Sequence, residues 1–520
     1  MPSTVTDSSE SSPSMKRWTI VDDMADAMFP SKEVAKERSF AIFGTRTRFV
    51  IMVLVLFCLT IIWSNILTFN FAIVCMVPDN KTTNSKFHEF TGSEKSIAIS
   101  VVAAAALAGN LPVVLLINKF GIRTVFTVLG FLSGAVTFLI PFTIHHGFGY
   151  LLVCRVLQGL AFASNFPVIG AFVARWSYHK QNGIFVSSLV AYVQLSPAIT
   201  NPVSGALCDS LGWPSIFYVH GGATVVIFTI YALVYRNNPG KHPMVKQVEF
   251  DKISRNKVSP MNKKAASKVP YKAILKTPAI WGIWFASIGN FVLVNTVFLF
   301  SPTYLSQVLD LKTTSTGFSS ALPPIGQFCV KIIIGFISDK IHFLSETNKF
   351  RMFNTVAFVG SAILLTVLGF MGTEHKSVNV LLLTLSTTIL GAAAGGFYKA
   401  GPVISKQYST FVTGNLSLGL TITMLILPAI ISLFAPQNTQ EEWRNVFLFV
   451  SITLCLMNIV FVFLIQGEPC WWTEEDSSTP SSTSQRKVFS IDAPSTDNTS
   501  ARKSTTSTVH SLNHDLNSII

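Results

Sequence analysis

The feature that most constrains this chain is the recurrence of long apolar stretches along most of the sequence. A helix of roughly 20 apolar residues spans the hydrocarbon core of a bilayer. The weaker alternating pattern of a transmembrane β-barrel is absent from the sequence. Hydrophobic residues make up 49% of the chain and charged residues 12%, and the mean hydropathy is +0.48, which excludes a soluble globular protein. The sequence therefore predicts an all-α membrane protein.

Twelve stretches are long and apolar enough to cross a membrane as helices. We expect the fourth to be one continuous helix, and we expect Pro197 and Pro202 to break the fifth, because proline interrupts a helix. The stretches cover residues 49–77, 96–117, 124–144, 150–175, 184–207, 216–235, 279–305, 317–338, 352–371, 378–399, 411–434 and 446–465.

Six of these spans precede a long basic loop and six follow it, which is the outline of the major facilitator fold with its two six-helix halves. The loop carries eleven Lys and Arg residues between positions 236 and 277. The expected domains are a disordered cytoplasmic N-terminus (1–45), an N-terminal half (46–236), a basic cytoplasmic linker (237–277), a C-terminal half (278–466) and a disordered cytoplasmic tail (467–520).

The basic residues also predict the orientation of the chain. Basic residues precede the first span, and Arg46 and Arg48 are the last of them. Their position places the N-terminus in the cytoplasm. Asn80 begins an Asn-Lys-Thr sequon in the next loop, where glycosylation requires the exterior or luminal side. An even number of spans then places both termini in the cytoplasm. The expected location of the protein is the plasma membrane or an endolysosomal or vesicular membrane. The net charge of +13 follows from this topology, so nucleic acid is not an expected partner.

Arg155 is the most informative single residue, because it lies inside the apolar run that forms the fourth span. A charge there costs roughly 2.5–3.5 kcal/mol by insertion scales, and such residues mark substrate or ion sites. The structural alternative is an arginine that snorkels or pairs within the protein. Small residues follow it at four-residue spacing, which would let a neighbouring helix approach closely: Gly159, Ala163, Pro167 and Ala171.

Two short motifs mark the same place in each half and indicate an internal repeat. Gly121 and Arg123 follow the second span in Asn118-x-x-Gly-x-Arg, and Gly335 and Asp339 follow the eighth in Gly-x-x-x-Asp. With the span count, this repeat supports a structure of two related halves.

Two lysines are further candidates for charge in the membrane. Lys331 lies eight residues before Asp339, so its ammonium group could snorkel to the interface. Lys399 follows a Gly-Ala-rich seam and could contact an anion. The apolar cores contain no acidic residue, which favours an anionic substrate. Neutral polar residues could complete a site or form interhelical hydrogen bonds: Asn70, Gln158, Asn165, Gln194, Asn201, Asn290, Asn295 and Asn415.

No enzymatic chemistry is indicated. The seven cysteines form no CxxC pair and no metal-ligand spacing, so we interpret those in or beside the apolar stretches, Cys75 among them, as small core residues. No nucleophile–base pair, phosphate loop or metal site is recognisable. The sequence indicates no cofactor.

The ordered set of short motifs resembles the anion/cation symporter family of the major facilitator superfamily, solute carrier family 17. The resemblance covers most of residues 46–470. The motifs that carry it are Arg155-Val-Leu-Gln-Gly-Leu before Pro167, Gly212-Trp-Pro-Ser-Ile-Phe-Tyr-Val-x-Gly221, Asn238-Pro-Gly-Lys-His-Pro243, Ala321-Leu-Pro323, Gly335-x-x-x-Asp339 and Glu442-Trp-Arg-Asn-Val-Phe447.

The departures from that family matter as much as the matches. The resemblance implies an anion-binding role for Arg155, which is retained. The family's first-span arginine corresponds to Thr68, its proton-coupling glutamate to Phe162, and the seventh-span arginine of its vesicular glutamate group to Asn290. Asn70 and Asn290 lie beside or at family site positions. A coupling ion, H⁺ or Na⁺, therefore stays open.

These observations predict a secondary active transporter of small anions, organic carboxylates or phosphate-like ions, that works by alternating access. Arg155, Asn70, Asn290 and Lys399 are the expected substrate-binding residues. The alternatives are a facilitative anion uniporter driven by membrane potential and a non-transporting membrane receptor that keeps the fold. The bilayer and a small anionic solute are the expected partners. The oligomeric state stays open, and the predicted fold is compatible with a monomer.

Overall fold

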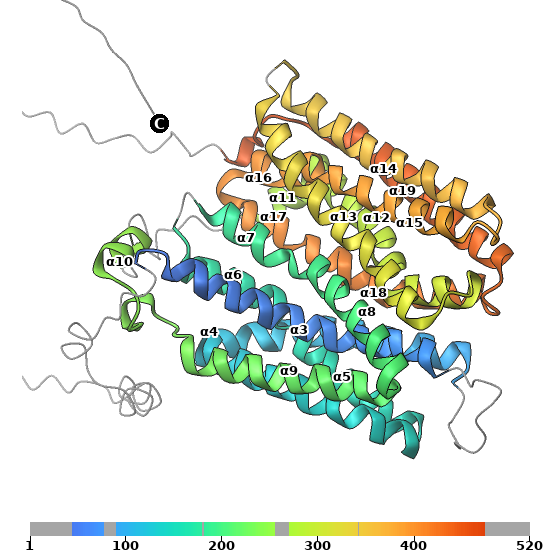
Figure 1. The fold of residues 1–520 in the computed structure, drawn as a ribbon. Coiled ribbons are helices and arrows are strands. Elements are labelled where there is room, and N and C mark those ends of the chain that lie inside the picture. The colour runs from blue at the N-terminus through green and yellow to red at the C-terminus, as the bar shows by residue number, and fades with distance from the viewer. Residues whose placement is uncertain (1–43, 77–89, 179–180, 255–269, 342, 474–520) are drawn as a thin grey trace, which may run out of the picture. The chain divides into compact units, whose positions relative to one another are not determined.

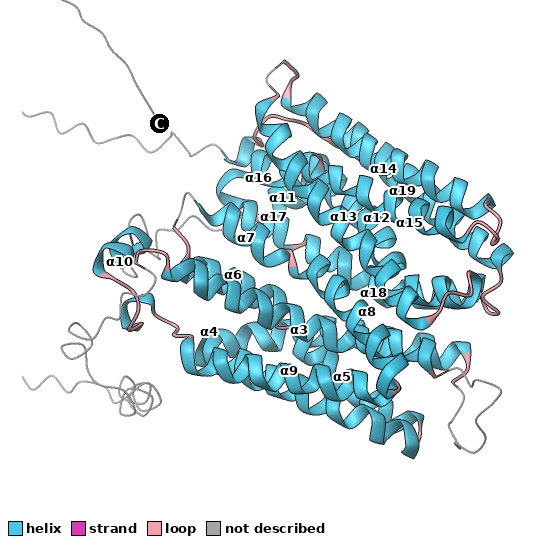
Figure 2. Ribbon diagram, in the orientation of Figure 1, coloured by secondary structure: helices cyan, strands magenta, loops and turns pink. Residues whose placement is uncertain are grey.

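The computed structural model describes residues 44–473 except 77–89, 179–180, 255–269 and 342. In this part of the chain the secondary structure is entirely helical, without strands (Figure 2). The predictions for the N-terminus, for Asn80 and for the tail beyond residue 473 lie outside the described residues. The predicted all-α fold is confirmed.

The first half of the described chain contains seven α-helices. Figure 1 labels them α3 to α9. Two of its membrane spans are each formed by a pair of shorter helices. The elements are α3 (Thr47–Cys75), α4 (Gly92–His146), α5 (Phe148–Phe162), α6 (Asn165–Trp176), α7 (Asn182–Val190), α8 (Tyr192–Leu211) and α9 (Trp213–Val234).

The second half repeats this order of spans. The elements are α12 (Pro278–Thr303) with a short π-helix (Tyr304–Val308), α13 (Thr313–Lys340), α14 (Glu346–Phe370), α15 (Lys376–Leu390), a 3₁₀ segment η6 (Gly391–Gly395), α16 (Phe397–Ser405), η7 (Lys406–Tyr408), α17 (Ser409–Gly414), α18 (Leu416–Phe434) and α19 (Gln440–Leu464).

Eleven helical stretches of the described chain are long and apolar enough to cross a membrane. One of them, α4, contains two spans, because Gly121 has φ 81° and ψ 162° and interrupts the helix. Only glycine adopts this conformation at little cost. A side chain here would also collide with Asn237, whose Nδ2 lies 2.5 Å from the position of a Cβ. Dividing α4 at Gly121 gives the twelve expected spans.

The fourth span is not the continuous helix that we expected. The helical structure stops at Phe162 and resumes at Asn165. Pro167 explains the break, because it lacks the N–H that would bond back to the carbonyl of Ala163. At the first turn of a new helix this missing N–H is harmless.

The fifth span breaks at Ala191, between α7 and α8, and not at its prolines as we expected. Pro197 and Pro202 both lie inside the continuous helix α8. Proline is tolerated within membrane helices where neighbouring groups satisfy the freed backbone carbonyls.

Part of the linker packs on the beginning of α3. The backbone N–H of Arg48 donates to Glu249 Oε1 at 3.0 Å, and Thr47 Oγ1 donates to the carbonyl of Met244 at 2.8 Å. Glu249 is fully buried and belongs to α10 (Gln247–Ser254). A carboxylate at a helix N-terminus satisfies free N–H groups and complements the helix dipole. We call this face of the bundle the linker side.

The two halves meet on the side opposite the linker. Ser96 Oγ at the beginning of α4 donates to the carbonyl of Pro428 in α18 at 3.0 Å. The backbone N–H of Thr314 in α13 donates to Asp209 Oδ2 in α8 at 3.0 Å, and the Thr314 hydroxyl bonds to the same oxygen. These residues lie toward the ends of their helices, so the halves are bonded to each other on this side.

Two glycines allow α8 and α13 to approach closely there. A Cβ on Gly317 would lie 2.6 Å from the carbonyl oxygen of Asn201. A Cβ on Gly205 would lie 3.0 Å from the carbonyl oxygen of Thr313. The contact between the halves thus depends on backbone packing against backbone, as is common in membrane helices.

A disulfide joins Cys75 at the end of α3 to Cys208 near the end of α8. The interpretation of Cys75 as a core residue was therefore wrong. Sequence spacing could not reveal this pair, because 133 residues separate the two cysteines. The bond lies on the side opposite the linker, where the sequence predicts the oxidising exterior or lumen.

Residues 467–473, which we expected in the disordered tail, pack against the C-terminal half. Trp472 Nε1 donates to Thr277 Oγ1 at 2.9 Å, and the N–H of Cys470 donates to the carbonyl of Ile404 at 2.9 Å. The apolar Trp472 ring is buried in the core, which explains why the chain stays attached here.

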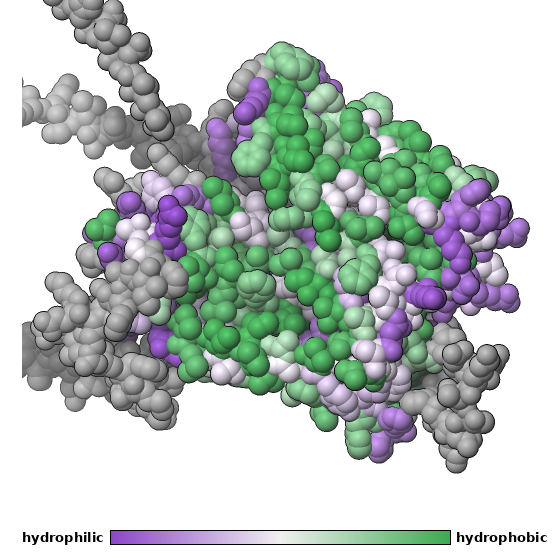
Figure 3. All heavy atoms as spheres, viewed as in Figure 1, coloured by the Kyte–Doolittle hydropathy of each residue, from purple (hydrophilic) through white to green (hydrophobic). Residues whose placement is uncertain are grey.

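The surface agrees with a membrane setting. Figure 3 shows a broad hydrophobic area over the helices, with hydrophilic residues gathered toward the linker side and the opposite side. Large apolar side chains such as Phe336, Leu233 and Phe463 are exposed on the surface of the helices. Contiguous apolar surface of this kind requires lipid contact. The protein is a multi-pass membrane protein.

Candidate functional site

Arg155 is fully buried within the N-terminal half, and neutral groups hold it. Its Nε donates to the carbonyl of Ala98 at 2.9 Å, and its Nη1 donates to the carbonyl of Ile66 at 3.2 Å and to Gln158 Oε1 at 2.8 Å. The guanidinium lies over the ring of Phe69, 4.7 Å from the centroid. Nη2 is buried and has no partner among the described residues. Within the part of the chain that the structure describes, this cation therefore has no carboxylate partner.

Gln158 extends this arrangement into a polar network inside the helix bundle. Its Nε2 donates to the carbonyl of Asn65 at 3.0 Å and to Thr137 Oγ1 at 2.9 Å. Asn65 Nδ2 in turn donates to Ser133 Oγ and Thr224 Oγ1, each at 2.9 Å. The network joins α3, α4, α5 and α9. Such satisfied buried networks fix side-chain positions, so Arg155 is held rigidly.

Asn70 lines a cavity of about 120 Å³ between the halves, on the side opposite the linker. Helices α3 and α4 of one half and α12 and α18 of the other form its walls. Asn70 is 3% exposed, and neither of its side-chain atoms has a partner among the described residues. Ile99 also lines the cavity and follows Ala98, which accepts from Arg155. Arg155 therefore lies behind the cavity wall.

The two expected site residues of the C-terminal half occupy different surroundings. Asn290 Nδ2 in α12 donates to the Tyr398 hydroxyl in α16 at 3.3 Å, while its Oδ1 has no partner among the described residues. Lys399, the next residue of α16, donates to Asp339 Oδ1 at 2.6 Å and to Ser338 Oγ at 3.1 Å. Lys399 is thus engaged in an ion pair at the linker-side end of α13.

The repeat motifs take different structural roles in the two halves. Arg123 donates through Nε and Nη2 to the carbonyl of Ala232, at 3.1 and 2.7 Å, so the turn after Gly121 is fixed to the end of α9. In the second half Asp339 pairs with Lys399, which fixes the end of α13 to α16. Gly335 faces open space.

The small-residue face behind Arg155 makes a close helix contact. A Cβ on Gly159 would overlap the carbonyl oxygen of Val102 in α4. Ala163 lies at the same contact, because a Cβ on Gly109 would come within 3.3 Å of its methyl group. Pro167 lies beyond the break, in the first turn of α6.

Helix breaks occur at corresponding positions of the two halves. The fourth and tenth spans are interrupted at Ala163–Ser164 and at η6, and the fifth and eleventh are interrupted at Ala191 and Asn415. Interrupted spans at matching positions are the strongest structural indication of a transport site between two repeats. Asn165, Tyr192 and Tyr398 each lie at or one residue after the start of the helix that follows a break.

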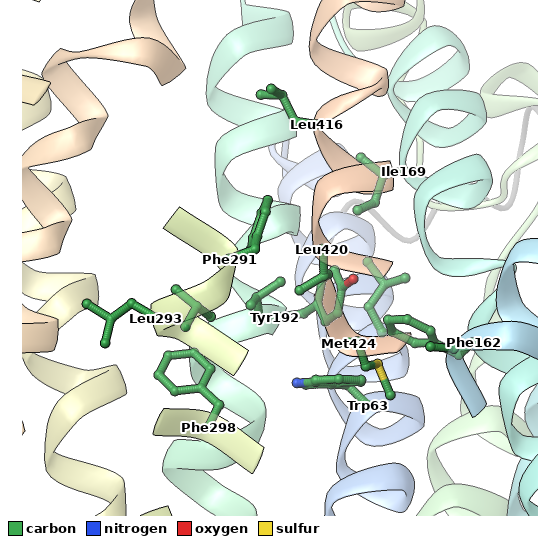
Figure 4. Close-up of a cluster of buried hydrophobic side chains, with 14 of the residues drawn as sticks. Trp63, Phe162, Ile169, Tyr192, Phe291, Leu293, Phe298, Leu416, Leu420 and Met424 are labelled. Atoms are coloured by element: carbon green, nitrogen blue, oxygen red, sulfur yellow. The ribbon is translucent and has the colours of Figure 1, made fainter. Parts of the chain in front are cut away.

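Between these breaks lies an apolar cluster that includes Trp63, Phe162, Tyr192, Leu420 and Met424 (Figure 4). Trp63 and Phe162 stack with their ring centroids 4.8 Å apart and their planes at 28°. The family resemblance assigned this position to a proton-coupling glutamate. In this chain Phe162 occupies it and makes an aromatic packing contact instead.

Several residues near the centre were not singled out from the sequence. Trp63, Tyr192 and Tyr398 looked like ordinary apolar-span residues, since aromatic side chains are frequent throughout the chain. Only the helix breaks and the three-dimensional packing distinguish them. Of the neutral polar residues, Gln194 forms the expected interhelical bond and donates to Gln327 Oε1 of the other half at 3.0 Å. Asn295 Nδ2 similarly bonds Thr423 Oγ1 in α18 at 2.8 Å.

The family model of the Major Facilitator Superfamily matches residues 49–401. Human sialin is 28% identical over 357 residues, which are 68% of this chain and 70% of sialin. Sodium-dependent phosphate transport protein 1 of Oryctolagus cuniculus is 23% identical over 477 residues, 87% of this chain and 99% of that protein. A probable small intestine urate exporter of Mus musculus is 25% identical over 399 residues, 75% of this chain and 80% of the exporter.

Solved structures agree on the fold. A bacterial homologue of the human lysosomal transporter Spinster, in an inward-facing and occupied conformation, superposes with a TM-score of 0.62 at 10% identity. The match covers 81% of this chain and 97% of the homologue. The xylose transporter XylE from E. coli gives a TM-score of 0.55 at 12% identity and covers 80% of this chain and 98% of XylE.

Proposed function

Because this chain belongs to the Major Facilitator Superfamily, as a divergent relative of sialin and the sodium-dependent phosphate transport proteins, we propose that it moves small anions by alternating access. The observation that carries the proposal is the buried Arg155, whose partners are neutral and whose Nη2 is unpartnered among the described residues. An anion at Nη2 would form a charge-assisted hydrogen bond and compensate the charge.

The relatives support the substrate class. Two of them are named for phosphate and urate, both of which are anions at neutral pH. A guanidinium suits carboxylate and phosphate groups because its planar donors match their oxygens. Asn70, with its unpartnered amide beside the cavity, is the residue that we propose to contact substrate on the side opposite the linker.

The proposed orientation places the linker side in the cytoplasm, as the basic residues favour. The hydrogen bonds between the halves lie on the opposite side, so this conformation is then closed to the exterior. Transport would require these contacts to open while the linker side closes, as in rocking of two repeats around a central site.

A uniport mechanism is the second candidate, and the distribution of acidic residues favours it. Within the described spans, Asp and Glu lie only at helix ends, for example Glu94, Asp209 and Asp339. Phe162 packs on Trp63 and supplies no carboxylate for a proton. Moving one charge through 100 mV is worth about 2.3 kcal/mol, roughly a fifty-fold gradient, so a monoanion could be concentrated without a coupling ion.

Substitution of Arg155 tests the proposal. Reconstituted protein should take up radiolabelled inorganic phosphate or urate, and Arg155→Ala should abolish uptake. Arg155→Lys should lose most of it, because a lysine cannot reproduce the separate bonds to Ala98, Ile66 and Gln158. Lys119→Ala, a change at an exposed lysine, is the control and should leave uptake unchanged. Full uptake by Arg155→Ala would refute the assigned role.

A further inference from the structure

Lys331 lies on the buried face of α13. Side chains at other positions around the helix, including Ile332 and Phe336, are exposed as lipid-facing residues are. Gln327, one turn before Lys331, and Ser338, two turns after it, are fully buried. Residues four and seven positions apart share a helix face. The half-buried Lys331 therefore lies on the face of α13 that packs against the protein.

Among the residues that the structure describes, the ammonium group of Lys331 meets an aromatic ring and no carboxylate. Nζ lies over Tyr398 of α16, 5.1 Å from the ring centroid. Lys331 has neither a hydrogen-bond acceptor nor an acidic partner among the described residues. A cation–π contact of this kind contributes a modest attraction and leaves the three N–H donors available to a ligand.

The neighbouring Lys399 shows that the protein supplies a carboxylate where a lysine is structural. Lys399 is adjacent to Tyr398 in α16 and is neutralised by Asp339 at 2.6 Å. Two lysines thus come from the same pair of helices, and only one has its counter-charge. An unpaired cation inside the membrane is costly unless a ligand compensates it.

Two buried polar atoms without partners in the described chain belong to Asn290, which bonds to Tyr398, and to Gln327, one helical turn before Lys331. Tyr398 accepts from Asn290, whose amide oxygen is buried and unpartnered among the described residues. Gln327 Oε1 accepts from Gln194 of the other half, while Gln327 Nε2 is a buried N–H donor without a partner in the described chain. Lys331 therefore lies one helical turn from a contact between the halves.

The broken tenth span brings its backbone against this part of α13. A Cβ on Gly391 would lie 2.7 Å from the carbonyl oxygen of Gln327 and 3.1 Å from the backbone nitrogen of Lys331. After η6, α16 begins at Phe397, immediately before Tyr398. The N-terminus of a discontinuous membrane helix favours anionic groups, and here it adds to the charge of the lysine.

We propose that Lys331, with Tyr398 and the amide of Gln327, binds the anionic group of the transported solute on the C-terminal half. The ammonium group supplies the charge, and the tyrosine hydroxyl and glutamine N–H supply neutral donors. Asn290 positions Tyr398 through their hydrogen bond. This inference rests on the proposed function and adds a second cationic contact, separate from Arg155, at the contact between the two halves.

The test is a comparison of Lys331→Gln, Lys331→Arg and Tyr398→Phe in proteoliposomes with labelled phosphate and urate. Losing a charge-assisted contact should raise the KM of Lys331→Gln by about tenfold to a hundredfold. Lys331→Arg should keep most of the affinity, and Tyr398→Phe should lose less than Lys331→Gln. Lys340→Gln is the matched control, since Lys340 is exposed at the end of the same helix.

Thermal stabilisation by the same two anions gives a second measurement that needs no transport. Wild type and Lys340→Gln should gain thermal stability with anion, and Lys331→Gln should gain less at equal concentration while remaining folded. Wild-type KM and wild-type stabilisation in Lys331→Gln would overturn the inference and leave the proposed function intact. Absence of both flux and stabilisation in the wild type would overturn the proposed function itself.

Discussion

Individual residues decide how closely the helices of this protein approach. Gly159 in α5 packs against the backbone of Val102 in α4. It directly follows Gln158, which accepts a hydrogen bond from Arg155. Gly170 in α6 is also a helical glycine in the fourth span, but nothing lies within 4 Å of where its Cβ would be. An added methyl group would therefore collide with backbone atoms at position 159 and enter open space at position 170.

We expect Gly159→Ala to destabilise the protein, because the added methyl group collides with a backbone carbonyl that cannot rotate away. Overpacking of this kind costs about 1–3 kcal/mol. Gly170→Ala should be neutral or slightly stabilising, since alanine favours the helix and open space accommodates it. Thermal unfolding in detergent measures both, and equal melting temperatures for the two variants would contradict the packing argument.

Arg155 shows what the sequence can and cannot predict at this scale. Its position in an apolar run indicated a buried charge, but its partners are carbonyls of Ala98 and Ile66, distant in the sequence. Lys399 was predicted from the same kind of pattern, yet the fold brings Asp339 to it. A pattern reports that a charge is buried, whereas the identity of its partner depends on tertiary packing.

Among the elements, the linker shows how a polar segment is fixed to the bundle. His242 is 4% exposed and lies edge-on to Trp176, with ring centroids 5.5 Å apart. Its Nε2 donates to the carbonyl of Val234 at 3.1 Å, and its Nδ1 accepts from the N–H of Met244 at 3.2 Å. The pKa of His242 is lowered to about 4, chiefly by burial; the Val234 bond opposes this shift and the charge of Arg236 contributes to it.

This pKa predicts that acid loosens the linker. Native His242 is neutral, and its ordinary pKa is 6.5, so its contribution to stability is complete above pH 6.5. The contribution is lost as the pH falls from 6.5 toward 4, up to about 3 kcal/mol in all. Thermal melts from pH 7.5 to 4.5 should fall more steeply for wild type than for His242→Gln. Parallel curves for the two proteins would contradict the prediction.

The sequence predicted the elements well where apolar length determines them and poorly where local backbone chemistry does. The membrane spans could be predicted because each of them needs a long apolar run of residues. The break at Ala191 was not predicted, since Pro197 and Pro202 looked like the stronger interruptions of the fifth span, and Pro167 was placed in a continuous fourth span. Whether a proline breaks a membrane helix depends on neighbours that the sequence of one segment does not contain.

For the whole molecule, the contacts between the halves determine which side is closed. The bonds of Ser96 to Pro428 and of Thr314 to Asp209 lie on the side opposite the linker. The disulfide between Cys75 and Cys208 joins two helices of the same half on that side, so it leaves motion between the halves free. Alternating access requires the contacts between the halves on this side to separate while each half stays intact.

The central claim is that the protein moves an anion across the membrane and does not merely bind one. The most direct measurement is uptake of labelled phosphate and urate into proteoliposomes on which a membrane potential and a pH gradient are imposed separately. A potential, positive inside, or the pH gradient should drive accumulation of at least one of the two anions, and Arg155→Ala should abolish it. Anion-induced thermal stabilisation without uptake under either gradient would contradict the claim and identify a receptor that keeps the transporter fold.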